Sequence, residues 1–384
     1  MSDYLDVPFN AAYVAGGELD YIRDAIENTR LAGNGPYCEW CAGWLQERTG
    51  AARVLLTHSG TAALEMAALL AGIGPGDEVI MPSFTFTSTA NAVVLRGGVP
   101  VFVDIRPDTL NIDEERVPAA ITSRTRAVFP VHYAGVGAEM DVLSAIASEA
   151  GLVLVEDAAQ GLLSTYRDKP LGSFGPFAAL SFHETKNIIC GEGGALLVND
   201  PHMVERAEMV HEKGTDRGRF FRGEVDKYTW QDTGSSFLLG ELGAGFLRAQ
   251  LEAADRIQAL RRATWDSYHR AFEPYEAAGL LRRPVVPDAC EHNAHIYYLL
   301  LGSGEERDLL IRGLAERGVS AVFHYVPLHS SPAGRRFGRV VGDLQATDNV
   351  SERLLRLPLW AGMESRHVEH VISSVASVLD RART

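Results

Sequence analysis

Residues 177–199, FAALSFHETKNIICGEGGALLVN, carry the pattern that decides the fold of this chain. Two short apolar runs, 177–182 and 194–199, flank a polar turn that contains Lys186 and the glycine-rich sequence GEGG. Both runs are largely continuous rather than alternating, which is typical of strands buried on two faces of a mainly parallel sheet. Of the four lysines in the chain, only Lys186 has an expected strand on each side.

Further apolar runs extend this pattern toward the N-terminus. They occupy residues 54–59, 78–83, 99–105, 127–133 and 152–157. Helical segments such as 61–72 and 140–151 lie between them, and each ends at a glycine suited to a helix C-cap. The sequence therefore predicts a layered α/β domain with a mainly parallel, seven-stranded sheet.

The pattern changes after about residue 200. A helical segment, a long polar loop with arginines and aromatic residues, and the periodicity of one long helix follow, at 202–214, 214–236 and 237–272. Strand-like runs at 295–301 and 319–328 then combine with helices at 306–318 and 366–382. We therefore expect a large α/β domain over residues 1–245 and a smaller α+β domain over residues 246–384.

The composition argues against several classes of protein. The 384 residues carry a net charge of -14, which argues against a broad basic face for nucleic acid. No apolar run approaches the roughly 18–20 residues of a membrane span, and no basic segment precedes an apolar stretch at the start. Cys38 and Cys41 form a CEWC pair, but no second pair completes a zinc site. We expect a cytoplasmic protein without a metal and with neither nucleic acid nor a membrane as partner.

The stretch THSGTAALEMAALL (57–70) contains a candidate anion site. Ser59, Gly60 and Thr61 open a helix, and the first N–H groups of a helix attract a phosphate. Glycine also lets a phosphate approach the backbone closely. An ordinary helix N-cap is the alternative interpretation.

The stretch LVLVEDAAQG (152–161) places Asp157 at the carboxyl end of an expected strand, where α/β sheets bind ligands. A buried carboxylate there needs a cationic or N–H partner, and the pyridinium nitrogen of pyridoxal phosphate (PLP) is one such partner. Asp157 could instead cap the next helix.

Lys186 lies 29 positions after Asp157. A free lysine amine, with a pKa of about 10.4, is a poor nucleophile at neutral pH. A lysine joined to an aldehyde cofactor as a Schiff base becomes a proton shuttle once substrate displaces it. Together, the phosphate-type helix start, Asp157 and Lys186 indicate a fold-type I PLP enzyme.

With these residues in place, the chain resembles the DegT-type nucleotide-sugar aminotransferases, and more narrowly the dTDP-4-amino-4,6-dideoxygalactose transaminases. The resemblance covers most of residues 8–260 and is thinner beyond them. The matching stretches are PFN (8–10), GDEVIMPSFTFTSTANAVVLRGG (76–98), FVDIRPDTLNID (102–113), PVHYAG (130–135), VEDAAQG (155–161), SFHETKN (181–187), GEGGALLVND (191–200), DKYTWQDTGSS (226–236), HIYYLLL (295–301), HYVPLH (324–329) and LPLW (357–360).

The resemblance implies how PLP would be held. Lys186 would be the Schiff-base lysine, Asp157 would keep the ring nitrogen protonated, and Gln160 would contact the ring or its O3′. The remaining cofactor contacts would be the stacking ring of Phe84 and the phosphate ligands Gly60, Thr61 and Ser181. Many relatives add an Asn from the neighbouring subunit where this chain has Ser236. The resemblance therefore implies a homodimer with shared active sites.

Substrate contacts follow from the same resemblance, each with a structural alternative. His183 and Glu184 could line the sugar pocket, although His183 could equally be a satisfied structural imidazole. Arg219 and Arg222 could clamp the diphosphate, or lie in an exposed solvated loop. The residues that would approach the sugar or nucleotide from the small domain are Tyr325 and His329.

The predicted reaction moves an amino group from an amino acid, by analogy L-glutamate, to the C4 ketone of dTDP-4-dehydro-6-deoxy-D-glucose. A C3-ketosugar or GDP-sugar aminotransferase of the same family is the nearest alternative. The related sugar 3-dehydratases replace the lysine with histidine, so Lys186 argues against them. A non-catalytic PLP-binding regulator, the alternative from another class, should have lost Lys186 or gained a nucleic-acid-binding segment.

Overall fold

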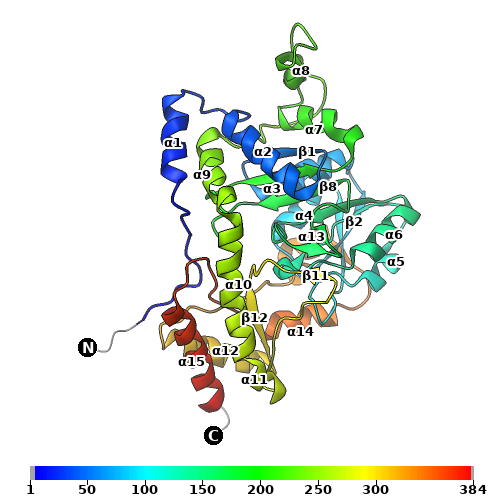
Figure 1. Ribbon diagram of the computed structural model, residues 1–384. Coiled ribbons are helices and arrows are strands. Elements are labelled where there is room, and N and C mark those ends of the chain that lie inside the picture. Colours follow the sequence, from blue (N-terminus) through cyan, green and yellow to red (C-terminus); the bar gives the residue numbers. More distant parts are fainter. Residues whose placement is uncertain (1–4, 382–384) are drawn as a thin grey trace.

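The computed structural model describes residues 5–381. Its central layer is a sheet of eight strands in the order β1-β9-β8-β5-β4-β2-β3-β14 (Figure 1). The strands are β1 (Arg53–Thr57), β2 (Glu78–Pro82), β3 (Val99–Val103), β4 (Thr125–Val128), β5 (Val153–Asp157), β8 (Phe177–Ser181), β9 (Gly194–Val198) and β14 (Arg339–Val340). All seven expected strands are present, and only β9 runs antiparallel to its neighbours β1 and β8.

The described helices are α1 (Glu18–Glu27), α2 (Pro36–Thr49), α3 (Gly60–Leu70), α4 (Thr87–Val94), α5 (Val117–Ala120), α6 (Met140–Ala150), α7 (Val204–His211), α8 (Arg217–Phe221), α9 (Glu241–Glu252), α10 (Ala254–Ala271), α11 (Glu273–Ala277), α12 (Gly304–Ala315), α13 (Pro332–Phe337), α14 (Gln345–Arg353) and α15 (Ser365–Arg381). Short strands β6 (Thr165–Tyr166), β7 (Lys169–Pro170) and β11 (Cys290–Glu291) form a separate three-stranded sheet.

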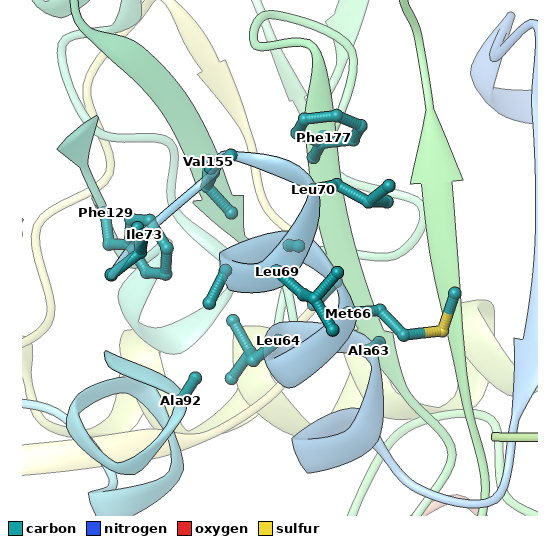
Figure 2. Packing of buried hydrophobic residues seen from close by; sticks show 14 of the residues in the cluster. Ala63, Leu64, Met66, Leu69, Leu70, Ile73, Ala92, Phe129, Val155 and Phe177 are labelled. Carbon is teal, nitrogen blue, oxygen red and sulfur yellow. The ribbon is translucent and has the colours of Figure 1, made fainter. Parts of the chain in front are cut away.

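Alternate residues of the central strands enter different cores, as the two-residue period of a strand requires. Leu196 packs with α3 in a cluster where Leu64, Leu69 and Leu70 meet Phe129, Val155 and Phe177 (Figure 2). Leu197, the next residue of β9, belongs to the cluster built by α2 and α9. The sheet is therefore covered on both faces, as the continuous apolar runs predicted.

The C-terminal part forms a second, antiparallel sheet in the order β10-β12-β15-β13. Its strands are β10 (Leu281–Arg282), β12 (Tyr297–Leu301), β13 (Val322–Phe323) and β15 (Leu354–Leu357), and α10, α12 and α15 contribute to its core. A bridge from Val7 to Val319 joins the N-terminal segment to this part. The expected domain boundary at residues 245 and 246 falls within α9, and this division stays a prediction.

Several local expectations need correction. The expected long helix 237–272 is two helices, α9 and α10, which separate at Ala253. The expected strand 319–328 is only the two residues of β13, and the polar loop 214–236 contains the short helix α8. The C-terminal helix is present, but residue 382 lies outside the described residues.

The eighth strand, β14, was not expected, because two residues carry no readable periodicity. It is held beside β3 by Arg339, whose Nη2 lies 2.7 Å from Oε2 of Glu78 at the start of β2. The Glu78 carboxylate is buried and also accepts hydrogen bonds from Arg124 and Thr122. These donors lower the pKa of Glu78 to about 2.

Replacing Glu78 with glutamine should lower the free energy of unfolding by about 2 kcal/mol at pH 7, a value discounted because the arginine partners are partly exposed. The lowered pKa means that this stabilisation is present above the ordinary glutamate pKa and is lost as pH falls toward about 2. Urea unfolding should therefore show the difference between Glu78→Gln and the wild type narrowing between neutral pH and pH ~3. The exposed Glu369 provides the matched control, Glu369→Gln. A difference that stays constant with pH would contradict this assignment.

Candidate active site

The carboxyl ends of two neighbouring strands define the site. Asp157 is the last residue of β5 and Ser181 is the last residue of β8, and the two strands pair in parallel with Asp157 opposite Ala179. Lys186 follows β8 in the turn that leads to β9. The topology thus brings together Asp157 and Lys186, two of the features that the sequence predicted separately.

The start of α3 forms a small cradle with the end of β8. The side chain of Ser59 caps the helix by accepting a hydrogen bond from the N–H of Ala62 at 3.1 Å. A Cβ on Gly60 would lie 2.8 Å from the Cβ of Ser181, so only glycine allows this approach. The hydroxyl of Thr61 lies 2.7 Å from that of Ser88 on α4. Hydroxyls and the first N–H groups of a helix therefore gather at one point, which is the chemistry of a phosphate site.

Asp157 is 5% exposed and is fixed by two hydrogen bonds. Its Oδ2 accepts from the hydroxyl of Thr89 at 2.7 Å, and its Oδ1 accepts from the N–H of Ala159 at 3.2 Å. Because the single proton of Thr89 is given to Asp157, Thr85, 2.9 Å away, must donate to Thr89. The remaining lone pairs of the carboxylate are left to accept from a cationic N–H group.

Lys186 is half-buried, and its pKa is lowered to about 8 from the ordinary value of 10.5. Burial is the main cause, the nearby charge of Arg356 adds to it, and the negative charge of Asp157 opposes it. An amine with this pKa is neutral in a substantial fraction of molecules near pH 8, and the neutral amine is the nucleophilic form. The following residue anchors the turn, because Asn187 donates to the carbonyl of Asn293 at 2.7 Å.

Gln160 and Tyr325 lie together beside this group. The Oε1 atom of Gln160 accepts from the N–H of Ala134 at 2.8 Å, and its Nε2 donates to the hydroxyl of Tyr325 at 3.1 Å. Tyr325 has a φ of 39°, a conformation that is uncommon for a residue other than glycine. The structure therefore brings one predicted cofactor residue and one predicted substrate residue into direct contact.

Two aromatic residues of the PSFTF segment differ in burial. Phe84 is 1% exposed, and its ring centroid lies 5.1 Å from that of Tyr133 and 5.4 Å from that of Tyr325. Phe86, immediately before α4, is 58% exposed. The sequence did not single out Phe86. Of the two rings, that of Phe86 is the one exposed to a ligand.

The other predicted substrate residues occupy varied positions. His183 contacts the hydroxyl of Thr185 through Nδ1 at 2.9 Å, and the neighbouring Glu184 is exposed. His329 lies 2.8 Å from the hydroxyl of Ser83 through Nδ1, at the end of β2. His329 therefore ties the C-terminal part of the chain to the carboxyl end of β2 in the central sheet.

Arg219 and Arg222 lie in or next to α8, which projects away from the central sheet (Figure 1). Arg219 pairs with Glu205 and Glu224, and Arg222 pairs with Glu208 and Glu224, at distances of 2.7 to 3.3 Å. Ser236 is exposed and forms a bridge with Glu212. Any role of these three residues in a shared site depends on a second subunit.

Four residues were missed by sequence reasoning: Phe86, Ser88, Thr89 and Arg356. Ser88 and Thr89 gave no signal, because their roles depend on where α4 lies relative to β5 and α3. Arg356 did give one, since it is a charged residue inside the apolar run LLRLPLW.

Within residues 5–381, no group of three or more His, Cys, Asp or Glu side chains is arranged to hold a metal ion. The thiols of Cys38 and Cys41 are buried and contact the carbonyls of Leu239 and Ala244, each at 3.4 Å. Burial raises the pKa of both thiols. No helix in the described part of the chain has both the length and the apolar character needed to cross a membrane.

The residues present fit PLP in three respects. The cradle at Gly60 suits a phosphate, Asp157 suits a protonated ring nitrogen, and Lys186 suits an aldehyde. The phosphate, the ring nitrogen and the aldehyde are three of the groups by which an enzyme holds this cofactor. The fit rests on the close approach of Gly60 to Ser181 and on the carboxylate positions that Thr89 leaves open.

Comparisons with known proteins agree with this fit. Residues 14–376 match the model of the DegT/DnrJ/EryC1/StrS aminotransferase family. The chain is 33% identical over 384 residues to the spore coat polysaccharide biosynthesis protein SpsC of Bacillus subtilis, covering 98% of both chains. The family match begins before α1 and ends within α15.

Solved structures share the fold. DesV of S. venezuelae, solved in complex with a ketimine intermediate, is 32% identical, with a TM-score of 0.87 over 98% of this chain and 99% of that one. The PLP form of Spr1654 from Streptococcus pneumoniae, a putative sugar aminotransferase, is 25% identical, with a TM-score of 0.90 over 99% and 100% of the two chains. The predictions of a fold-type I architecture and of PLP as cofactor are confirmed.

Proposed function

Because this chain belongs to the DegT/DnrJ/EryC1/StrS aminotransferase family and is a PLP-dependent sugar aminotransferase, we propose that it aminates the C4 ketone of dTDP-4-dehydro-6-deoxy-D-glucose, with L-glutamate as donor. The observation that carries the transamination is the position of Lys186 in the turn after β8, next to β5, where its amine interacts with the charge of the fixed Asp157 carboxylate. The choice of sugar is supported by the resemblance of residues 76–98 and 226–236 to enzymes that act on it.

The roles of the residues follow from their geometry. When bound, PLP supplies an aldehyde that takes up the amino group and a ring that accepts electrons. Asp157, fixed by Thr89, holds a proton on the ring nitrogen. Lys186 takes a proton from the Cα atom of the donor and returns protons when the sugar is aminated, so one amine acts as base and as acid.

The cradle and the ring-side residues hold the cofactor in this proposal. Gly60, Thr61 and Ser181 bind the phosphate, and Ser88 joins them through its contact with Thr61. Gln160 contacts the ring from the side of Tyr325. Phe86 covers one face of the cofactor ring. Its phenyl ring is exposed and free to stack on a ligand, whereas the predicted Phe84 next to it is buried.

The enzyme is proposed to be a homodimer with shared sites. Support comes from the long segment 214–236, where Phe221, Tyr228 and Trp230 are exposed, with Trp230 at 81%. Exposed aromatic side chains of this size are enriched in protein interfaces. Ser236, Arg219 and Arg222 would then reach the neighbour's cofactor phosphate and sugar diphosphate.

Incubation of the purified holoenzyme with dTDP-4-dehydro-6-deoxy-D-glucose and L-glutamate tests the proposed substrate. We expect a 4-amino sugar, identified by NMR, whose H3–H4 coupling reports an axial amine if it is small and an equatorial amine if it is large. A C3-ketosugar and a GDP-linked 4-ketosugar, assayed in parallel, should be poorer substrates. Faster amination of either one, or no amination of dTDP-4-dehydro-6-deoxy-D-glucose, would contradict the choice of sugar.

A further inference from the structure

Arg356 lies on β15, one of the two inner strands of the C-terminal sheet. β15 pairs with β12 on one side and β13 on the other, with Tyr298 opposite Arg356 on β12. Leu355 and Leu357 belong to the core of the small domain, whereas Leu354 packs in the cluster that contains Phe84 and Tyr133. Because side chains two residues apart share a face of a strand, Arg356 is on the face that meets that second cluster.

The Arg356 guanidinium is half-buried and lacks an acidic partner. Its Nε atom is buried without a hydrogen-bond partner, and no carboxylate within residues 5–381 pairs with it. Its Cζ atom lies 4.7 Å from the ring centroid of Phe9. A guanidinium taken out of water needs anionic or hydrogen-bonding partners, so this arrangement calls for a ligand with negative charge.

The contacts of Phe9 and Asn10 link this cation to the turn that carries Lys186. Asn10, the neighbour of Phe9, donates through Nδ2 to the carbonyl of Glu184 at 3.2 Å, two residues before Lys186. The positive charge of Arg356 is also among the causes that lower the pKa of Lys186. The cation therefore lies near enough to the lysine amine for the two positive charges to interact.

Three anions could approach this cation in the proposed reaction. The cofactor phosphate has its own cradle at the start of α3. The diphosphate of the sugar nucleotide is attached at C1, on the far side of the sugar ring from the reacting C4 ketone. The α-carboxylate of the amino-acid donor is bonded to the same carbon as the amino group that reacts next to Lys186.

We propose that Arg356 binds the α-carboxylate of the amino-acid donor and makes the first half-reaction selective for α-amino acids. This assignment rests on the proposed transamination and names a substrate contact within it. The sugar has no anionic group beside its C4 ketone, so Arg356 serves the donor half-reaction and not the sugar half-reaction.

The test compares three donors in single turnovers of the PLP holoenzyme. The loss of the visible absorption of the cofactor measures the rate of each turnover. The donors are L-glutamate, its α-carboxamide and its side-chain carboxamide. Wild type should use the α-carboxamide about 100-fold less efficiently than L-glutamate, because a charge-assisted pair is lost. Arg356→Gln should lower the rate with L-glutamate by a similar factor. It should also reduce the preference for L-glutamate over its α-carboxamide to about 5-fold or less.

Controls separate binding from folding. Arg366, which is exposed and paired with Glu364, provides the matched variant Arg366→Gln, which should keep the wild-type preference. Arg356→Lys should recover part of the preference because it keeps the charge. Arg356→Gln should slow the half-reaction with L-glutamate at least tenfold more than the half-reaction with the amino sugar product, and its PLP content should be unchanged.

The results distinguish a failure of the Arg356 assignment from a failure of the proposed function. A wild type that accepts the α-carboxamide as readily as L-glutamate would overturn the assignment even if every Arg356 variant failed to fold. The assignment would also be overturned if Arg356→Gln kept the wild-type preference for L-glutamate over its α-carboxamide. The same holds if the variant lost rate only with the side-chain carboxamide. A wild-type holoenzyme that takes an amino group from no amino acid would overturn the proposed function itself, and the Arg356 assignment with it.

Discussion

Lys186→Ala is expected to lower the rate of amino transfer by about 10⁴-fold or more, because both half-reactions depend on this one amine as acid and base. The variant should still bind PLP through the cradle at Gly60, but without the visible absorption of lysine-bound cofactor. Steady-state assays and an absorption spectrum of the purified protein give both results.

Lys169→Ala is the matched control for this loss. Lys169 is exposed and lies over the ring of Phe174 at 5.9 Å, outside the group of residues around Asp157. This variant should keep its activity within about 2-fold. Residual activity of Lys186→Ala within tenfold of wild type would show that another group moves the proton.

Asp157→Asn is expected to lower the rate of amino transfer by about 1,000-fold while leaving the cofactor bound. Asparagine keeps the size of the side chain but does not hold a positive charge on the ring nitrogen, so the ring accepts electrons less readily. The rate of the half-reaction with L-glutamate measures the effect, and PLP released from denatured protein measures the content.

Thr89→Val separates the charge of Asp157 from its placement. This variant removes the 2.7 Å hydrogen bond to Oδ2 but keeps the carboxylate, so a loss of about tenfold is expected. If Asp157→Asn lost less activity than Thr89→Val, the charge of Asp157 would not be the important property.

The fold could be predicted largely because buried parallel strands have a strong sequence pattern. The strands that lead to Asp157 and to the turn around Lys186 could be recognised as continuous apolar runs followed by polar residues. β14 was not visible, because its two residues are held by the pair of Arg339 with Glu78 across distant segments. The short strand β13 ends before Tyr325, whose positive φ and the nearby Pro327 do not favour an extended strand.

The break between α9 and α10 also had no local signal. Ala253 is a good helix former, and neither proline nor glycine lies at the break. Tertiary packing explains it, because α9 packs on α1 and α2, whereas α10 packs on α15. A pattern along the sequence does not show that α9 and the first turn of α10 pack in one core, whereas the rest of α10 packs in another.

The site could be predicted only where a residue's role follows from its place on a strand. Asp157 and Lys186 are such residues. Phe84 and Phe86 have the same local sequence character, and only burial distinguishes them. Thr89 supports Asp157 from a helix 68 positions away in sequence, a contact that no spacing rule describes.

The most direct test of the central claim is to locate the bond between PLP and the protein. Reduction of the wild-type holoenzyme with borohydride fixes the cofactor to its lysine, and peptide mass spectrometry then identifies that lysine. We predict that the added mass lies on the peptide that contains Lys186. Attachment to Lys169, Lys213 or Lys227, or no attachment at all, would contradict the account.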